Sequence, residues 1–127
     1  MKGQITLEYM VLSLVVIALL SISITALINI RDNSDKAMDI VFFKSSAKDL
    51  YNAIEEVCVM GNKNSREIYL KKEVSISDEG DYLEFSSSLP HVDGTLKYEC
   101  SCDVDSETLD GTVIVHNDNG IVGFNQP

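Results

Sequence analysis

Charge is missing from one long stretch near the start of this chain. The 22 residues from Tyr9 to Ile30 include no Asp, Glu, Lys or Arg, and no Pro or Gly. As an α-helix this run is about 33 Å long, close to the roughly 30 Å hydrocarbon core of a bilayer. A secretory signal peptide has an apolar stretch of only about 7–15 residues, with its cut site after it. The run is therefore too long for a signal peptide of that kind and predicts a membrane-spanning helix.

A few short polar side chains interrupt the apolar run. The helix tolerates hydroxyls there because they can bond back to its own carbonyls. The polar residues are Ser13, Ser21, Ser23, Thr25 and Asn29.

Basic residues are scarce in the rest of the chain. The whole sequence has 10 Lys and Arg against 20 Asp and Glu, a net charge of −10. Lys2 and Glu8 are the only charged residues before Arg31, so residues 31–127 carry all of that net charge. Binding to nucleic acid phosphates needs clustered Lys and Arg, so nucleic acid is excluded as an expected partner. A negative charge of this size favours solubility and repulsion between copies.

The sequence also lacks an arrangement for catalysis or for a metal ion. No nucleophile with a neighbouring base is recognisable, so we expect no enzyme and no cofactor. A zinc site would need the three cysteines and either His91 or His116, but no C-x-x-C spacing supports one. We therefore predict no metal site and expect both histidines to be ordinary surface or turn residues.

The number of cysteines is odd. Cys58, near the end of a predicted helix, can bridge to Cys100 or to Cys102, which would link the helix to a strand. Alternate residues of a strand point to opposite faces, so only one of Cys100 and Cys102 could face the helix. A bond between those two is not expected for the same reason. At least one thiol then stays free or pairs between chains.

A dense acidic run begins in the manner of a calcium loop, D-x-D-x-E. Thr108 stands where an EF-hand has its glycine, and the closing glutamate is missing. We predict a solvated loop before a turn at Gly111, and leave weak cation binding open. The acidic residues are Asp103, Asp105, Glu107 and Asp110.

The sequence also has no Asn-x-Ser/Thr sequon, so N-glycosylation is not predicted.

The segment before the apolar run carries a lone carboxylate. Lys2-Gly3 is followed by Gln4-Ile5-Thr6-Leu7-Glu8, and the run begins with Tyr9. A charge at the bilayer centre costs roughly 2.5–3.5 kcal/mol, so Glu8 needs a partner if it enters an apolar environment. Cleavage after Gly3 would place a new α-amino group on Gln4, one helical turn before Glu8. The amine and the carboxylate would then neutralise each other, within one chain or between neighbours.

This N-terminal arrangement resembles the class III signal peptide of archaeal type IV pilins. The resemblance implies a prepilin peptidase that cuts between Gly3 and Gln4, leaving Gln4 as the mature N-terminus. It also implies that Glu8 sets the register of the subunit in a filament. The leader of three residues is very short, so recognition by the peptidase would rest on Lys2-Gly3 and the helix that follows.

The helix is expected to continue past the apolar run. Residues 31–36 are polar, weak helix formers and favour a kink, an unwound link or a hydrated helix turn. Apolar residues then recur at steps of three and four, which predicts a stripe that packs on the chain's own sheet. Gly61-Asn62 predicts the helix end just past Met60. The stripe comprises Ala37, Ile40, Val41, Ala47, Leu50, Tyr51, Ile54, Val57 and Cys58.

Beyond Asn62 the apolar period changes to two, which predicts strands. Residues 67–71 and 74–77 form two strands or one bent strand. Asn117-Asp118-Asn119-Gly120 is the strongest hairpin signal in the chain. An antiparallel sheet packed on a long helix is an α+β fold, and its layout matches that of type IV pilins. The further expected strands are 82–86, 95–100, 112–116 and 121–124.

These patterns predict four parts: a leader 1–3, a hydrophobic helix 4–30, its amphipathic continuation 31–60, and an antiparallel β head 61–127. Lys2 favours a precursor in the cell membrane with its N-terminus inside. The predicted function is a structural subunit of an archaeal type IV pilus, in which many copies form an extracellular filament for surface attachment. Its expected partners are itself, the prepilin peptidase and the pilus assembly machinery. The alternative is an uncut single-span anchor that carries an acidic binding module.

Overall fold

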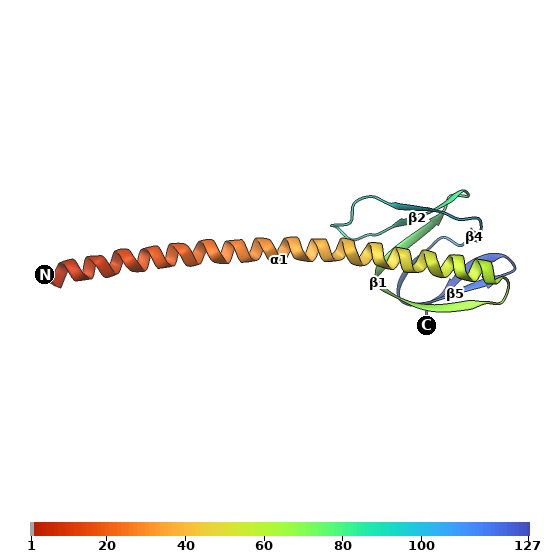
Figure 1. The fold of residues 1–127 in the computed structure, drawn as a ribbon, viewed down its shortest axis with the longest axis horizontal. Helices are drawn as coiled ribbons and strands as arrows, with labels where there is room; N and C mark the ends of the chain where they lie inside the picture. The colour runs from red at the N-terminus through yellow and green to blue at the C-terminus, as the bar shows by residue number, and fades with distance from the viewer. Residues whose placement is uncertain (1) are drawn as a thin grey trace. The chain divides into compact units, whose positions relative to one another are not determined.

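The computed structural model describes residues 2–127. Met1, the first residue of the expected leader 1–3, lies outside the described residues. Within these residues one helix precedes six strands, which confirms the α+β fold. Figure 1 shows the helix followed by the strands along the chain. The elements are α1 (Lys2–Met60), β1 (Ser65–Asp78), β2 (Tyr82–Ser86), β3 (Leu96–Glu99), β4 (Asp103–Val104), β5 (Glu107–Asp118) and β6 (Ile121–Asn125).

The chain divides into two compact units, an N-terminal unit that ends at Asp35 and a head unit from Lys36 to Pro127. The N-terminal unit is the first part of α1, and its side chains are exposed throughout residues 2–35. Residues 31–36 are helical, so the polar segment neither unwinds nor ends the helix. Of the three alternatives left open by the sequence, the unwound link is therefore wrong.

The helix ends where the glycine signal predicts. Gly61 has a φ of +85°, and its N–H donates to the Val57 carbonyl at 3.2 Å. The Asn64 amide donates to the Met60 carbonyl at 2.7 Å. A residue without a Cβ adopts this left-handed conformation at no steric cost, which explains why the helix stops at this point.

The sheet has the strand order β3-β2-β1-β5-β6-β4. Segments 67–71 and 74–77 belong to one strand, β1, whose register against β5 shifts between Leu70 and Val74. The bent strand, rather than two separate strands, is thus the correct alternative. Neighbouring strands are antiparallel, except that β4 pairs with β6 in parallel. The sheet is therefore mixed, because the chain passes from the β3 edge to the opposite edge before it forms β4.

The β5–β6 hairpin forms at the predicted turn. Asp118 pairs with Ile121, and the two residues between them, Asn119 and Gly120, have φ values of 54° and 88°. Positive φ at both central residues is the geometry whose twist suits a two-residue hairpin.

The expected loop before Gly111 is wrong. β5 begins at Glu107, and Gly111 lies inside it opposite Leu70, with a φ of 68°. Leu109 is fully buried and pairs with Val74, so one apolar side chain holds this otherwise acidic segment in the sheet. Gly111 marks the irregularity beside the register shift, where its positive φ is tolerated.

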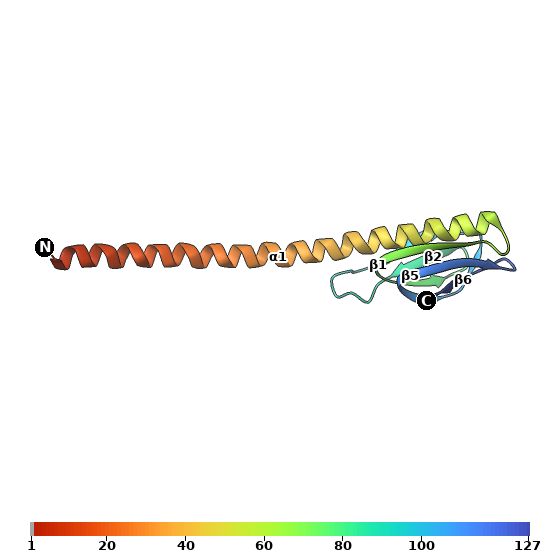
Figure 2. The same ribbon diagram turned by 90° about the horizontal axis from the view of Figure 1, so that it is seen from below.

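The core of the head unit lies between one face of the sheet and residues 43–57 of α1, as Figure 2 shows. Of the predicted stripe, Ala47, Leu50, Ile54 and Val57 are fully buried, whereas Ala37 and Val41 are exposed. Phe43 and Ala53 are buried without having been assigned to the stripe. The sheet contributes Leu70, Val74, Ile76, Leu83, Phe85, Leu109, Val113, Val115, Val122 and Phe124.

Ser46 joins the helix to the irregular part of β1. Its side chain is buried, and its hydroxyl oxygen accepts bonds from the Lys71 and Lys72 N–H groups at 3.0 and 3.3 Å. The Lys72 ammonium also lies 2.8 Å from a carboxylate oxygen of Asp39. Because the register shift interrupts the strand ladder here, the serine supplies an acceptor that the neighbouring strand does not.

Candidate functional site

The predicted processing site lies in the first turn of α1. Gly3 and Gln4 are both helical and exposed, and a Cβ added at Gly3 would meet no other atom within 4 Å. No steric contact within the described residues therefore requires a glycine at position 3. The first N–H groups of a helix have no intrahelical partner, so this turn unwinds more easily than the helix interior. A peptidase can reach the Gly3–Gln4 bond once that turn opens.

Glu8 lies in a shallow hollow on the helix surface, lined also by Ile5, Tyr9 and Leu12. The ion pairs within residues 2–127 join Arg66 to Glu56 and Lys72 to Asp39, both in the head unit. Glu8 therefore has no charged partner within the part of the chain that the structure describes. Its carboxylate remains available to a group from outside this chain or to a new N-terminus.

The apolar side chains of the N-terminal unit have no protein covering. Leu7, Ile22 and Ile30 are 64%, 67% and 65% exposed, and the other large apolar residues between them are similar. By length and composition α1 can cross a membrane. At about 25 cal/mol per Å² of apolar surface, leaving such a run in water is strongly unfavourable, so it must be covered by lipid or by protein.

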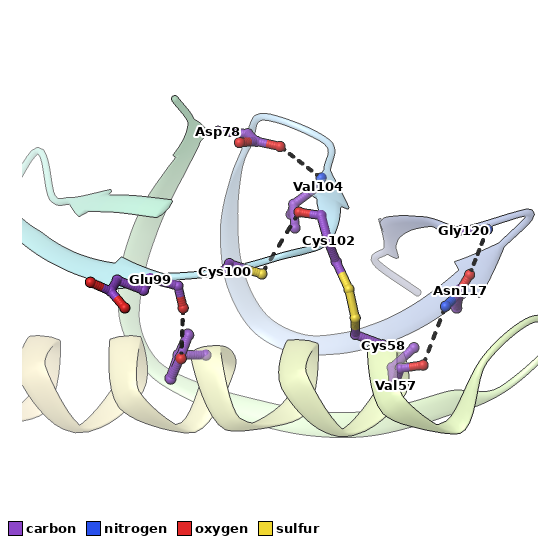
Figure 3. The surroundings of a disulfide bond; sticks show 10 residues. Val57, Cys58, Asp78, Glu99, Cys100, Cys102, Val104, Asn117 and Gly120 are labelled. Atoms are coloured by element: carbon purple, nitrogen blue, oxygen red, sulfur yellow. Dashed lines mark hydrogen bonds between the residues drawn. A yellow bond between two sulfur atoms is a disulfide. The ribbon is translucent and has the colours of Figure 1, made fainter. Parts of the chain in front are cut away.

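The three cysteines gather where the end of α1 meets the β3–β4 connection. The structure joins Cys58 of α1 to Cys102 by a disulfide, and Cys100 keeps a free, buried thiol (Figure 3). β3 ends at Glu99, so Cys100 and Cys102 lie in irregular chain, where strand alternation does not separate them. The Cys100 thiol contacts the Cys102 carbonyl oxygen, with 3.7 Å between sulfur and oxygen.

Burial and nearby carboxylates perturb two groups beside this disulfide. Burial raises the pKa of the Cys100 thiol, a backbone hydrogen bond with Cys102 opposes that rise only in part, and the Glu55 carboxylate adds to it. Burial also raises the pKa of Tyr51, and Glu55 adds to the effect. The Tyr51 hydroxyl donates to the Glu99 carbonyl at 2.8 Å, and its ring stacks on that of Tyr98 with centroids 4.6 Å apart.

A buried asparagine that the sequence did not single out also holds the helix end. Asn117 is 5% exposed, and its amide nitrogen donates to the Val57 carbonyl at 3.3 Å. Its amide oxygen accepts the Gly120 N–H at 3.0 Å, as Figure 3 shows. Asn62 accepts the Asn119 N–H at 2.9 Å nearby. The hairpin motif named Asn117 only as a turn residue, because its bond to the helix depends on tertiary packing.

The acidic run does not converge on one point. Asp103 lies in β4, Glu107 and Asp110 lie in β5, and Asp105 lies between these strands. Within residues 2–127 no group of three or more His, Cys, Asp or Glu side chains is placed to hold a metal ion. The run is thus spread over β4, the interior strand β5 and the connection between them, and does not form one loop around a cation.

The two histidines lie apart from each other and from the cysteines. His91 is exposed in the β2–β3 connection, where it borders a cavity of about 230 Å³ together with Ile40 and Phe43 of α1. His116 is half-buried in β5 and lies over Gly123, and Asp105 approaches the same point. Since Cys58 and Cys102 are bonded to each other, neither histidine completes a cysteine-rich zinc site.

Comparison with known protein families gives one match. Residues 2–26 match the family model described as Class III signal peptide. No curated protein and no solved structure matches the chain significantly. The match supports the resemblance drawn from Lys2-Gly3, Glu8 and the apolar run, and indicates a type IV pilin-like surface subunit that a prepilin peptidase processes. The long apolar helix is consistent with a membrane-anchored precursor.

Proposed function

We propose that the chain is a structural subunit of an archaeal type IV pilus. The prepilin peptidase cuts between Gly3 and Gln4, the assembly machinery draws the helix out of the membrane, and copies pack into a filament. The main support for this proposal is that residues 2–26 match a class III signal peptide, while no other part of the chain covers the apolar side chains of the same segment. The role is structural and not enzymatic.

The exposed run has two successive environments in this proposal. In the precursor, lipid covers it, with the N-terminus on the cytoplasmic side. In the filament, the helices of neighbouring copies cover it. Identical subunits joined by contacts that do not close on themselves form a helical polymer. The acidic head units form the outer surface, which serves for surface attachment.

Glu8 is the register residue of this assembly. After cleavage, the Gln4 amine has a pKa of about 7.7–8.0 and is largely a cation at neutral pH. A carboxylate and an ammonium that leave water together each need the other, because an unpaired charge is costly in an apolar core. In this proposal the partner amine belongs to a neighbouring copy, so a copy placed out of register would leave Glu8 unpaired, and this penalty selects the correct position.

The test begins with mass spectrometry of the mature chain from cells. We expect an N-terminus at Gln4, and the variant Gly3→Val should accumulate with Met1 retained. An unprocessed wild-type chain that stays in the membrane would favour the alternative, a single-span anchor with an acidic binding module.

A second measurement addresses assembly. Sheared cell-surface material is examined by electron microscopy for filaments that contain this chain. Glu8→Ala should be processed normally, keep a folded head unit and yield few filaments. Tyr9→Phe is a matched control that keeps the hollow around position 8 and all charges. Normal filaments from Glu8→Ala would contradict the register role.

A further inference from the structure

Resting on the function proposed above, we infer that Asn29 is a second polar contact between copies of this chain. Its carboxamide bonds the helix of a neighbouring copy and restricts how the apolar helices pack. The partner is thus the N-terminal unit of a second copy.

The polar side chains of the apolar run fall into two groups. The hydroxyls of Ser21, Ser23 and Thr25 donate to the carbonyls of residues 17, 19 and 21, at 2.9, 2.8 and 2.9 Å. Ser13 donates in the same way to Met10 at 3.1 Å. These groups are satisfied within their own helix, so they can enter a dry environment without a partner.

Asn29 belongs to the other group. Within residues 2–127 its amide makes no hydrogen bond to its own helix, in contrast to the four hydroxyls. A carboxamide carries two N–H donors and one carbonyl acceptor, and burying them unpaired is unfavourable. A lipid tail offers neither donor nor acceptor, whereas the amide of a second copy offers both.

The position of Asn29 fits a change of environment during assembly. It stands two residues before Arg31, at the end of the uncharged run. In the precursor this end lies near the bilayer surface, where water and headgroups satisfy the amide. When neighbouring helices replace lipid and water, the amide must find a protein partner.

The surface around Asn29 admits a close neighbour. Asn29 borders a hollow lined also by Ile22 and by three small side chains that let another helix approach, namely Ser21, Thr25 and Ala26. A separate hollow contains Glu8. Each hollow thus includes a polar side chain, Glu8 in one and Asn29 in the other, for which residues 2–127 supply no side-chain partner.

Glu8 and Asn29 lie near opposite ends of the apolar run. With about 100° of rotation and 1.5 Å of rise per residue, their separation of 21 residues places them about 60° apart around the helix and about 31 Å apart along it. One helix therefore presents its two polar contacts at different heights. A neighbouring copy that is displaced along the helix axis makes a heterologous contact, which extends the assembly instead of closing it into a dimer.

The test compares full-length variants in cells that assemble the wild-type chain. Asn29→Leu keeps the branched shape and the number of side-chain heavy atoms but removes the amide, and Asn29→Gln keeps an amide on a longer side chain. Ser23→Ala is the matched control, because it removes a hydroxyl that bonds only its own helix. For each variant, mass spectrometry reports the mature N-terminus and sheared material reports the filament yield. Electron cryomicroscopy reports the helical rise and rotation.

We expect Asn29→Leu to be processed normally. Because a satisfied buried polar group selects one packing, this variant should lose about tenfold in filament yield or form filaments with a different helical rise or rotation. Asn29→Gln should recover most of the yield, and Ser23→Ala should match the wild type. Unchanged yield and unchanged symmetry for Asn29→Leu would overturn the inference alone. A processed wild-type chain that forms no filaments would overturn the proposed function as well.

Discussion

Removing the disulfide between α1 and the β3–β4 connection should destabilise the head unit substantially. Cys58 and Cys102 are separated by 44 residues in the sequence. In the chain-entropy model, closing a loop of that length lowers the entropy of the unfolded chain by an amount worth about 4 kcal/mol at 25 °C. We therefore expect Cys58→Ser to lower the free energy of unfolding by about that amount.

Cys58→Ser is a cleaner variant than Cys102→Ser, because the latter leaves Cys58 and Cys100 able to link α1 to the β3–β4 connection again, whereas Cys58→Ser leaves no cysteine in α1. The assay is urea unfolding of residues 36–127, which include all of the buried core, followed by circular dichroism. Cys100→Ser is the control, since it removes a cysteine but no crosslink. A loss below about 1 kcal/mol for Cys58→Ser, or equal losses for both variants, would refute the chain-entropy argument.

The remaining predictions concern the head unit. Gly123→Ala should cost about 1–3 kcal/mol in urea unfolding, because the new Cβ would lie 3.0 Å from the His116 ring and 3.2 Å from the Asp105 carboxylate. Ser46→Ala should cost about 1–3 kcal/mol in the same assay, because two backbone N–H groups of β1 lose their acceptor. The Cys100 thiol should react slowly with iodoacetamide until the head unit unfolds, since burial raises its pKa and only the thiolate reacts. The folded state holds the Cys100 thiol proton more tightly than the unfolded state does. The stability that this thiol contributes is therefore present below the ordinary thiol pKa and is lost as the pH rises through the raised pKa. A free energy of unfolding that rises across that alkaline range would contradict the raised pKa.

The features that could be predicted from the sequence have local causes. The helix end depends on the glycine at position 61, whose positive φ needs no distant contact. The β5–β6 turn depends in the same way on Asn119 and Gly120. The N-terminal segment was recognisable because the uncharged run and the position of Glu8 are properties of adjacent residues.

The features that sequence reasoning missed depend on distant contacts. β5 begins at Glu107 because Leu109 finds a place in the core opposite Val74, which its acidic neighbours do not indicate. The parallel pairing of β4 follows from the path of the chain between sheet edges, and not from its two residues. Whether Cys100 or Cys102 meets Cys58 depends on where β3 ends. Asn117 was assigned only to a turn, although its side chain also holds the helix.

The strand order also bears on which part of the molecule can associate. The outermost strands, β3 and β4, have only four and two residues, so neither offers a long edge. Because β2 pairs only with residues 75–78 of β1, residues 65–74 of β1 have a neighbouring strand, β5, on one side only. Long free edges act as templates for strand addition, and short ones do not. The uncovered half of β1 is therefore the part of the head unit where a strand of another copy could add. Its charged residues, Arg66, Glu67, Lys71, Lys72 and Glu73, oppose such addition, because charged side chains on a strand edge disfavour pairing with another chain. In the proposed filament, these charges would keep crowded head units from fusing through their sheets.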